Sequence, residues 1–189
     1  MRIKLHLYRL LKRKQQTSLS LEETARSIGV KIGTDCRIYP CNFGSEPYLI
    51  SIGNHVTVTN GVHFITHDGG VWVLRNEYPE VDFVKPIIIY DNCFIGINAI
   101  ILPGVTIGPN SIVGAGSVVT NSIPPNTIAA GVPAKVIKSI EEYKKQNLKK
   151  CLSTKSLSRE EKKNFLLNFF GNTPEEWHIK MFDMDNLDK

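Results

Sequence analysis

Aliphatic side chains recur at every sixth position between Ile89 and Val119. The series reads Ile89, Ile95, Ile101, Ile107, Val113 and Val119, and glycine follows it at Gly96, Gly108 and Gly114. Side chains of small or modest size stand four places after aliphatic members, at Cys93, Ala99, Val105, Ser111 and Ser117. A period of six fits neither the 3.6-residue repeat of a helix nor the alternation of a hairpin strand, and a β-sandwich would not hold this phase for so long. The pattern predicts a parallel β-helix, in which short strands and corners alternate and equivalent side chains stack from coil to coil.

The same phase begins earlier in the chain and is interrupted twice. It starts at Ile32, slips by two residues across the region of Pro47, and resumes at Ile52. It lapses again from His67 to Pro86, which predicts a loop that leaves the coil. Loops longer than about 12 to 15 residues in a compact domain are usually functional or disordered. Because this loop contains several aromatic side chains, we expect residues 67–86 to be ordered and functional.

Residues 1–16 have the pattern of an amphipathic helix. Apolar side chains recur at helical spacing opposite six basic ones; the apolar set is Ile3, Leu7, Leu10 and Leu11. This pattern predicts a helix that caps the exposed strands of the first coil. Contact of this basic helix with an anionic membrane surface is the alternative interpretation.

Capping-box motifs predict three further helix starts. They pair Ser20 with Glu23, Ser158 with Glu161, and Thr173 with Glu176, the last with Pro174 at the first helical position. Together with the hexads, they predict a mainly β chain in three parts. These parts are an N-terminal helical cap (residues 1–29), a β-helix domain (30–138) and a C-terminal helical extension (139–189).

Composition narrows the class of protein. The chain has 189 residues, a net charge of +5 and 42% hydrophobic residues, which is typical of a folded globular protein. Apolar runs fall short of the roughly 20 residues of a membrane span, and the start lacks the apolar core of a signal peptide, so we expect a cytoplasmic protein. Its four cysteines form no CxxC pair, which favours reduced thiols. Basic residues gather at the termini without interleaved aromatic residues, which argues against nucleic-acid binding.

A resemblance adds to this interpretation. The segment that begins at Phe94 reads FIGINAIILPGVTIGPNSIVGAGSVVTNSIPPNTIAAGVPAKVI and closely resembles the C-terminal coils of hexapeptide-repeat acyltransferases. Within that superfamily the chain is most similar to sugar and polysaccharide O-acetyltransferases of the galactoside and maltose acetyltransferase type, over about residues 30–138. The resemblance implies a left-handed β-helix, acetyl-CoA as acyl donor, and a homotrimer that binds the donor between adjacent coils.

The same resemblance implies that His67 is the catalytic histidine. A sugar hydroxyl is a poor nucleophile at neutral pH, and an imidazole can take its proton as the oxygen attacks a thioester. Asp68 follows directly and is the predicted acidic partner, with Asp35 or Glu46 as more distant alternatives. His63 precedes His67 by four residues, but in strand sequence this spacing does not form a helical metal pair, so we expect no metal ion.

Six residues are implied as contacts of acetyl-CoA: Ile97, Ala115, Thr120, Asn121, Lys135 and Lys138. Ile97 and Ala115 would offer backbone groups to the pantetheine arm. Lys135 and Lys138 follow a proline turn and could meet the phosphates as cations. Many relatives have lysine where this chain has Asn121, so the sequence departs from the pattern at that position.

The acceptor is predicted from the loop and from one asparagine. Trp72 could stack on a sugar ring, Arg75 could bind hydroxyl or charged groups, and Asn42 matches a family asparagine near the acceptor. These residues favour acetylation of a sugar or a surface polysaccharide, including lipid-linked sugars. Antibiotic acetyltransferases and amino-sugar N-acetyltransferases are alternative enzymes with the same fold. An inactive β-helix scaffold is the alternative if the protein is not an enzyme.

Overall fold

The computed structural model describes residues 19–186, and it divides into two compact units. The first unit extends to Ile140 and the second begins at Glu141. The amphipathic helix predicted for residues 1–16 lies outside the described residues. In the part of the chain that the structure describes, no helix is long and apolar enough to cross a membrane.

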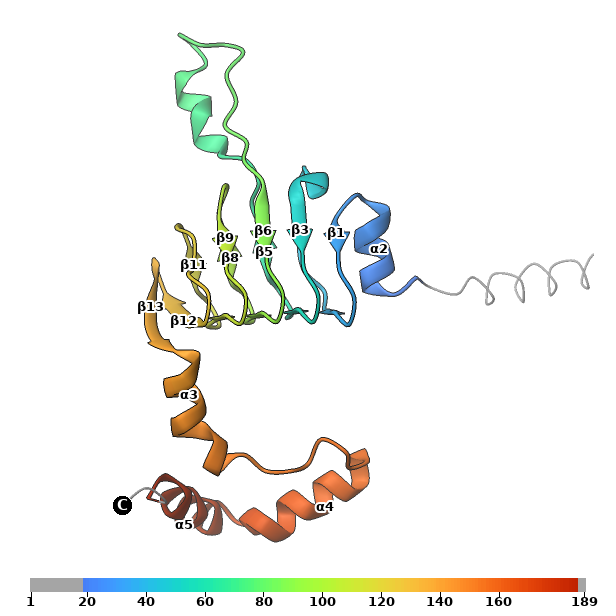
Figure 1. Cartoon of the computed structure of the whole chain (residues 1–189), viewed down its shortest axis with the longest axis vertical. Coiled ribbons are helices and arrows are strands. Elements are labelled where there is room, and N and C mark those ends of the chain that lie inside the picture. Colours follow the sequence, from blue (N-terminus) through green and yellow to red (C-terminus); the bar gives the residue numbers. More distant parts are fainter. Residues whose placement is uncertain (1–18, 187–189) are drawn as a thin grey trace, which may run out of the picture. The chain divides into compact units, whose positions relative to one another are not determined.

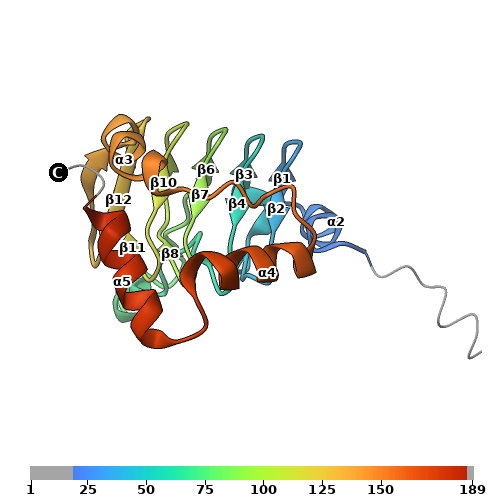
Figure 2. The same ribbon diagram turned by 90° about the horizontal axis from the view of Figure 1, so that it is seen from below.

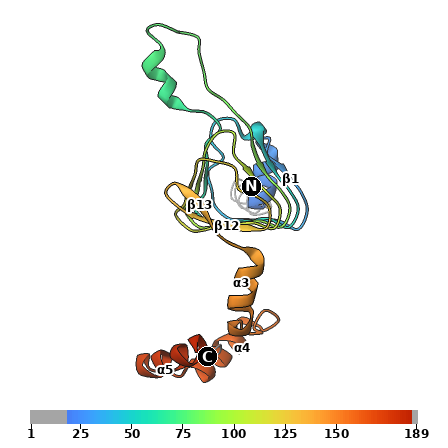
Figure 3. The same ribbon diagram turned by 60° about the vertical axis from the view of Figure 1, so that its left-hand side comes forward.

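The first unit is a coil of three sheets that form the sides of a triangular prism (Figure 3). Sheet A contains β1 (Lys31–Ile32), β3 (Ile50–Ile52), β6 (Ile87–Ile89) and β9 (Thr106–Ile107). Sheet B contains β2 (Arg37–Ile38), β4 (Thr57–Val58), β7 (Phe94–Ile95), β10 (Ile112–Val113), β12 (Thr127–Gly131) and β13 (Ala134–Ser139). Sheet C contains β5 (His63–Phe64), β8 (Ile100–Ile101) and β11 (Val118–Val119). Neighbouring strands pair in parallel, except that β13 folds back antiparallel on β12.

The strand register explains the period of six. Ile88 pairs with Thr106, and Ile100 pairs with Val118, eighteen residues later in each case, so that three hexads make one coil. All members of the aliphatic series are buried, as are the smaller residues four places after them. The prediction of a parallel β-helix is therefore confirmed, whereas its left hand is implied by the resemblance.

Because the core is a single stack, each inward residue is expected to contribute strongly to stability. The Ile101 side chain is fully buried. We expect Ile101→Ala to lower the free energy of unfolding by about 2 to 5 kcal/mol, because the change removes buried methyl groups and leaves a cavity in the prism. Chemical denaturation measures this loss. Ile137 is the same residue type but is 56% exposed, so Ile137→Ala should cost less than about 1 kcal/mol. Equal losses in the two variants would contradict a core of stacked coils.

Asparagines form a ladder along the corner between sheets A and B. Asn92, Asn110 and Asn126 each have a positive φ, which asparagine tolerates better than most residues. The Asn92 amide donates to Asn110 Oδ1 at 2.8 Å, and the Asn110 amide donates to Asn126 Oδ1 at 2.9 Å. His55 Nδ1 extends the ladder by a hydrogen bond to Asn92 Oδ1 at 2.8 Å. This exposed histidine therefore has a structural contact.

The first coil is irregular, and its irregularity sets the register of sheet C. Arg37 pairs with Thr57, twenty residues later, which confirms the predicted slip of two residues. Asn42 bridges His63 and comes five positions after Arg37, whereas His63 comes six positions after Thr57. The corner before Asn42 is therefore one residue shorter than the equivalent corner of the next coil. The additional residues are accommodated after Asn42, where the chain forms the short 3-10 helix η1 (Pro47–Leu49).

The predicted loop leaves the prism at the corner between sheets C and A (Figures 1 and 3). It contains a 3-10 helix, η2 (Gly69–Leu74). An antiparallel bridge between His67 and Val84 closes its base, and the Lys85 N–H donates to the Thr66 carbonyl. The two ends of the loop are thus held together directly beside His67.

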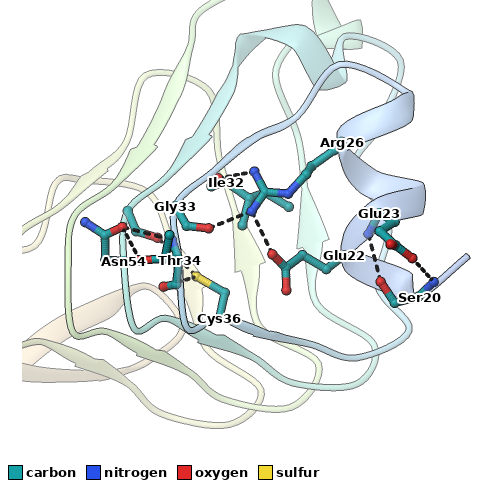
Figure 4. Close-up of polar contacts among 10 residues, drawn as sticks. Ser20, Glu22, Glu23, Arg26, Ile32, Gly33, Thr34, Cys36 and Asn54 are labelled. Carbon is teal, nitrogen blue, oxygen red and sulfur yellow. Dashed lines mark hydrogen bonds and ion pairs between the residues drawn. The ribbon is translucent and has the colours of Figure 1, made fainter.

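Helix α2 (Leu21–Ser27) packs on the first coil. Its predicted capping box between Ser20 and Glu23 is confirmed, and Ala25 is buried. The Arg26 guanidinium donates to the carbonyls of Ile32 and Gly33 and pairs with Glu22 (Figure 4). These contacts satisfy carbonyls of the first coil, before which residues 19–30 contain no strand.

Helix α3 (Ile140–Asn147) begins at the last residue of the first unit and continues into the second. The second unit also contains η3 (Leu148–Lys150), α4 (Arg159–Phe170) and α5 (Pro174–Asp185). Figure 2 shows the turn that joins α4 to α5. Both predicted capping boxes are confirmed, at Ser158 and at Thr173. Trp177 Nε1 donates to the Gly171 carbonyl at 2.9 Å and ties the start of α5 to the end of α4.

The cysteines are unpaired, as the sequence predicts: Cys36, Cys41, Cys93 and Cys151. Burial raises the pKa of the Cys41 thiol to about 11, and it also raises the pKa of Cys93. Because the thiolate is the reactive form, these two side chains act as small apolar fillers.

Candidate active site

The register of sheet C places Glu46 beside His67. Asn42 bridges His63, and four residues further along both segments Glu46 meets His67. Neighbouring parallel strands lie about 4.8 Å apart, so side chains in equivalent positions are within hydrogen-bonding reach. The Nδ1–Oε2 distance is 3.0 Å.

This hydrogen bond determines the roles of the two imidazole nitrogens. An ionised carboxylate only accepts, so Nδ1 of His67 donates its proton to Glu46. In neutral His67 the lone pair is then on Nε2, and the ring is 38% exposed. The hydrogen bond and charge of Glu46 raise the pKa of His67 above its usual value. The hydrogen bond from Thr66 is the largest cause that lowers the pKa of Glu46, and the one from His67 is the next. The carboxyl group of Glu46 therefore stays ionised.

Asp68 has a different contact from the one predicted. Its carboxylate accepts a hydrogen bond from the Gly70 N–H at 2.8 Å and so caps η2. Asp68 adds only a minor electrostatic contribution to the raised pKa of His67. The orienting acid is therefore Glu46, the alternative that the sequence left open, because residues adjacent in an extended chain point in different directions.

Two of the predicted donor contacts lie together in one groove. Ile97 and Ala115 line a groove of about 510 Å³, with Tyr39, Thr59 and Phe94 among the other lining residues. The groove follows the corner at which sheet B turns into sheet C. Its walls combine exposed apolar side chains with polar ones, which suits a long and flexible ligand.

Lys135 lies at the far end of the same corner. Lys135 pairs with Ala130 across the β12–β13 hairpin. Ala130 lies directly beside Gly114 of the groove, since a Cβ built on Gly114 would be 2.8 Å from the Ala130 Cβ. Lys138 pairs with Ile128 in the same hairpin. Lys135 is exposed and Lys138 is half-buried, and both lie on the β-helix unit beyond the coil that carries Ala115.

Thr120 and Asn121 lie elsewhere. They directly follow β11, at the corner between sheets C and A, and Asn121 donates to Thr120 Oγ1 at 3.0 Å. His67 lies at this same corner, after β5, two coils earlier. Five of the six predicted donor contacts are thus divided between two corners of one prism, and Lys138 lies farther along the hairpin, opposite Ile128.

The two corners are separated by the width of sheet C (Figure 3). From Asn60, which lines the groove, the chain crosses β5 before it reaches His67. The extended part of this path, residues 62–66, is five residues long and spans roughly 15 Å. His67 of one chain therefore cannot touch a thioester bound at the middle of that chain's own groove.

The predicted acceptor residues are also spread out. Trp72 is 74% exposed on η2, and Arg75 directly follows η2, where it faces Asp82 at 4.0 Å. Asn42 lies at the opposite end of sheet C from His67, and its side chain accepts from the Gly44 N–H at 2.8 Å. The loop residues are placed on the His67 side of the coil, and Asn42 is not.

Within residues 19–186, no group of three or more histidine, cysteine, aspartate or glutamate side chains is arranged as metal ligands would be. His55 and His63 are exposed on the coil, as the sequence predicts. His178 lies in α5, whereas His6 is outside the described residues.

Comparison with known proteins agrees with this architecture. The family described as the hexapeptide repeat of succinyl-transferase matches residues 86–121. The chain is 55% identical over 152 residues to Protein CapG of Staphylococcus aureus, covering 79% of this chain and 88% of that protein. It is 32% identical over 164 residues to a galactoside O-acetyltransferase of Lactococcus lactis, covering 70% of this chain and 76% of that enzyme. The chain belongs to the hexapeptide-repeat acetyltransferases.

Solved structures extend the likeness to the fold. The hexapeptide-repeat acetyltransferase VCA0836 of Vibrio cholerae is 29% identical, with a TM-score of 0.53, over 69% of this chain and 86% of that one. As a member of this family, the chain is an acyltransferase. Sequence reasoning missed Thr66, whose hydroxyl hydrogen-bonds to the carboxylate that contacts His67. Its only signal is its position beside His67 and one coil above the Glu46 segment.

Proposed function

We propose that this chain transfers the acetyl group of acetyl-CoA to a hydroxyl of a sugar or surface polysaccharide, lipid-linked sugars included. The observation that carries the proposal is the Glu46–His67 pair, with the Nδ1–Oε2 hydrogen bond of 3.0 Å. It leaves Nε2 as the proton acceptor, next to a long loop with exposed aromatic residues. The identity to a galactoside O-acetyltransferase supports a sugar acceptor.

In this mechanism His67 acts as general base and then as general acid. Nε2 takes the proton of the acceptor hydroxyl while the oxygen attacks the thioester carbonyl. Glu46 stabilises the imidazolium that forms, because its carboxylate remains hydrogen-bonded to Nδ1. The imidazolium then protonates the departing CoA sulfur as the carbon–sulfur bond breaks. The products are the acetyl ester and CoA, and no acyl-enzyme is needed.

Acetyl-CoA fits the groove at the corner of sheets B and C. Ile97 and Ala115 are exposed there, so their backbone groups can meet the amides of the pantetheine arm. Lys135 and Lys138 provide cations beyond the last coil, where phosphates would lie. This arrangement supports the residue roles that the resemblance implied.

A homotrimer would bring the two corners together. In a ring of three prisms, the groove of one chain faces the His67 corner of its neighbour, and Thr120 and Asn121 would complete the far wall. The separation of roughly 15 Å within one chain supports such a shared site. Each chain would then contribute its groove to one site and its His67 to another.

The acceptor would bind between His67, at the base of the loop, and the rest of the loop up to residue 86. Trp72 offers an exposed indole face, and a sugar ring can stack on such a face. Arg75 and Asp82 provide charged hydrogen-bonding groups on the same loop. We propose that these residues select a carbohydrate over a smaller alcohol.

The test is release of CoA from acetyl-CoA in the presence of sugars, oligosaccharides, lipid-linked sugars, amino sugars and acetylatable antibiotics. Mass spectrometry of the acceptor confirms the transferred acetyl group. Transfer to a sugar hydroxyl supports the proposal, whereas transfer only to an antibiotic or to an amine would replace it. If the protein neither binds acetyl-CoA nor transfers its acetyl group, the chain is a scaffold.

Glu46→Gln is expected to change both the rate and its pH dependence. The base works only as neutral imidazole, so activity is lost as pH falls through the raised pKa of His67. Without the carboxylate this pKa returns towards its usual value. The acidic limb of the kcat profile should therefore move to lower pH, while the plateau falls about tenfold to a hundredfold.

The pH–rate profile of kcat measures this prediction. Glu22→Gln is the control, because Glu22 also forms an ion pair, but with Arg26 of the same helix α2 and not with His67. Its profile should match that of the wild type. An unmoved acidic limb in Glu46→Gln would show that Glu46 does not tune the base.

A further inference from the structure

A buried hydroxyl shares the carboxylate oxygen that holds the catalytic histidine. Thr66 is fully buried, and its Oγ1 lies 2.6 Å from Glu46 Oε2. His67 Nδ1 lies 3.0 Å from the same oxygen. A carboxylate only accepts and a hydroxyl has one proton, so Thr66 donates its proton to Glu46. One oxygen therefore receives two donors from adjacent residues of the next coil.

The backbone that carries Glu46 is already fixed against the Thr66 segment. Gly44 has a φ of +66°, and a Cβ at this position would lie 2.8 Å from the Phe64 carbonyl oxygen. The same Cβ would be 3.8 Å from Thr66 Oγ1, and the Asn42 side chain accepts from the Gly44 N–H. The Glu46 side chain can still rotate about its own bonds, and the hydrogen bond from the Thr66 hydroxyl opposes this rotation.

We propose that Thr66 is a positioning residue, which holds Glu46 Oε2 in place so that His67 stays in the tautomer with its proton on Nδ1. This inference rests on the proposed function, in which Nε2 of that tautomer takes the proton of the acceptor. Loss of the hydroxyl releases the carboxylate, which is 20% exposed and can then turn towards water. The imidazole is then no longer held in one tautomer or one orientation.

The tautomer can be measured without any acceptor or turnover. Full-length protein labelled with ¹⁵N-histidine is recorded by long-range proton–nitrogen NMR above the pKa of His67, and the His67 signals are assigned by their loss in His67→Ala. Wild type and Thr66→Ser should show a protonated Nδ1 and an unprotonated Nε2. Thr66→Val should show averaged shifts of both tautomers. A wild-type tautomer in Thr66→Val would overturn the proposal, even if the transferase activity itself were not found.

Kinetics provide the second readout. Thr66→Val should lower kcat about tenfold with an unchanged KM for acetyl-CoA, and Thr66→Ser should restore most of the rate. Because Thr66 acts through Glu46, adding Thr66→Val to Glu46→Gln should cause little further loss. Additive losses would overturn this route of action.

Two further variants separate positioning from folding. Thr127→Val removes a hydroxyl that donates to the Pro124 carbonyl at 2.7 Å, remote from His67, and should leave both the tautomer and kcat unchanged. Thr66→Ala lacks the hydroxyl without adding a methyl group in its place, and it should reproduce the NMR result of Thr66→Val. If Thr66→Ala keeps the wild-type tautomer, the hydroxyl does not position Glu46.

Discussion

Replacing His67 with alanine is expected to lower kcat about a thousandfold while acetyl-CoA still binds. The variant loses the group that takes the hydroxyl proton and the group that protonates the CoA sulfur. Donor binding should persist, because the groove residues Ile97 and Ala115, which are proposed to hold the pantetheine arm, are unchanged. The expected result is thus a fall in kcat with a nearly constant affinity for acetyl-CoA.

Release of CoA in the presence of the accepted sugar measures the rate, and calorimetry measures donor binding. The four free cysteines require a blank without acetyl-CoA if the assay detects thiols. His63→Ala is the matched control, since His63 is an exposed histidine of the same strand segment. It should keep the wild-type rate. Full activity in His67→Ala would remove this histidine from the mechanism.

Two inactive variants are expected to restore activity when they assemble together. His67→Ala loses the base at one corner, and Ala115→Trp fills the groove at the other with an exposed side chain that the fold can accommodate. In a ring of three chains, each site takes its base from one chain and its groove from the next. Any ring that mixes the two variants therefore contains one site with both halves intact. Mixed trimers should show about one third of wild-type activity.

Co-expression with two different tags and purification on both isolates the mixed trimers. Each variant alone, and the two homotrimers combined after purification, should stay inactive and serve as controls. A site built within one chain predicts no recovery, because no chain in the mixture carries both halves. The measurement therefore distinguishes a shared site from a self-contained one, and size-exclusion chromatography with light scattering checks the trimer itself.

The local part of the fold was accessible from the sequence. Stacking in a β-helix requires an inward residue at each sixth position, so the series from Ile89 to Val119 predicted the coil. The capping boxes at Ser20, Ser158 and Thr173 predicted helix starts, because each depends on side chains only three residues apart. The loop after His67 was predicted by the same logic, as a break in phase.

The contact between Glu46 and His67 depends on register between coils, which local patterns do not encode. Asp68 was the natural acidic partner in sequence, yet its carboxylate caps η2, and Glu46 reaches His67 from the previous coil. That pairing depends on one short corner before Asn42 and additional residues after it, and these irregularities interrupt the hexads.

The sequence by itself therefore determined the coil, its loop and its helix starts, because these follow from side chains a few residues apart. Only the tertiary structure decided which acid holds His67, and that Thr120 and Asn121 lie at a different corner from Ile97 and Ala115. The physical reason is that a parallel coil places residues about one full turn apart in contact. Small changes in corner length then decide which side chains meet.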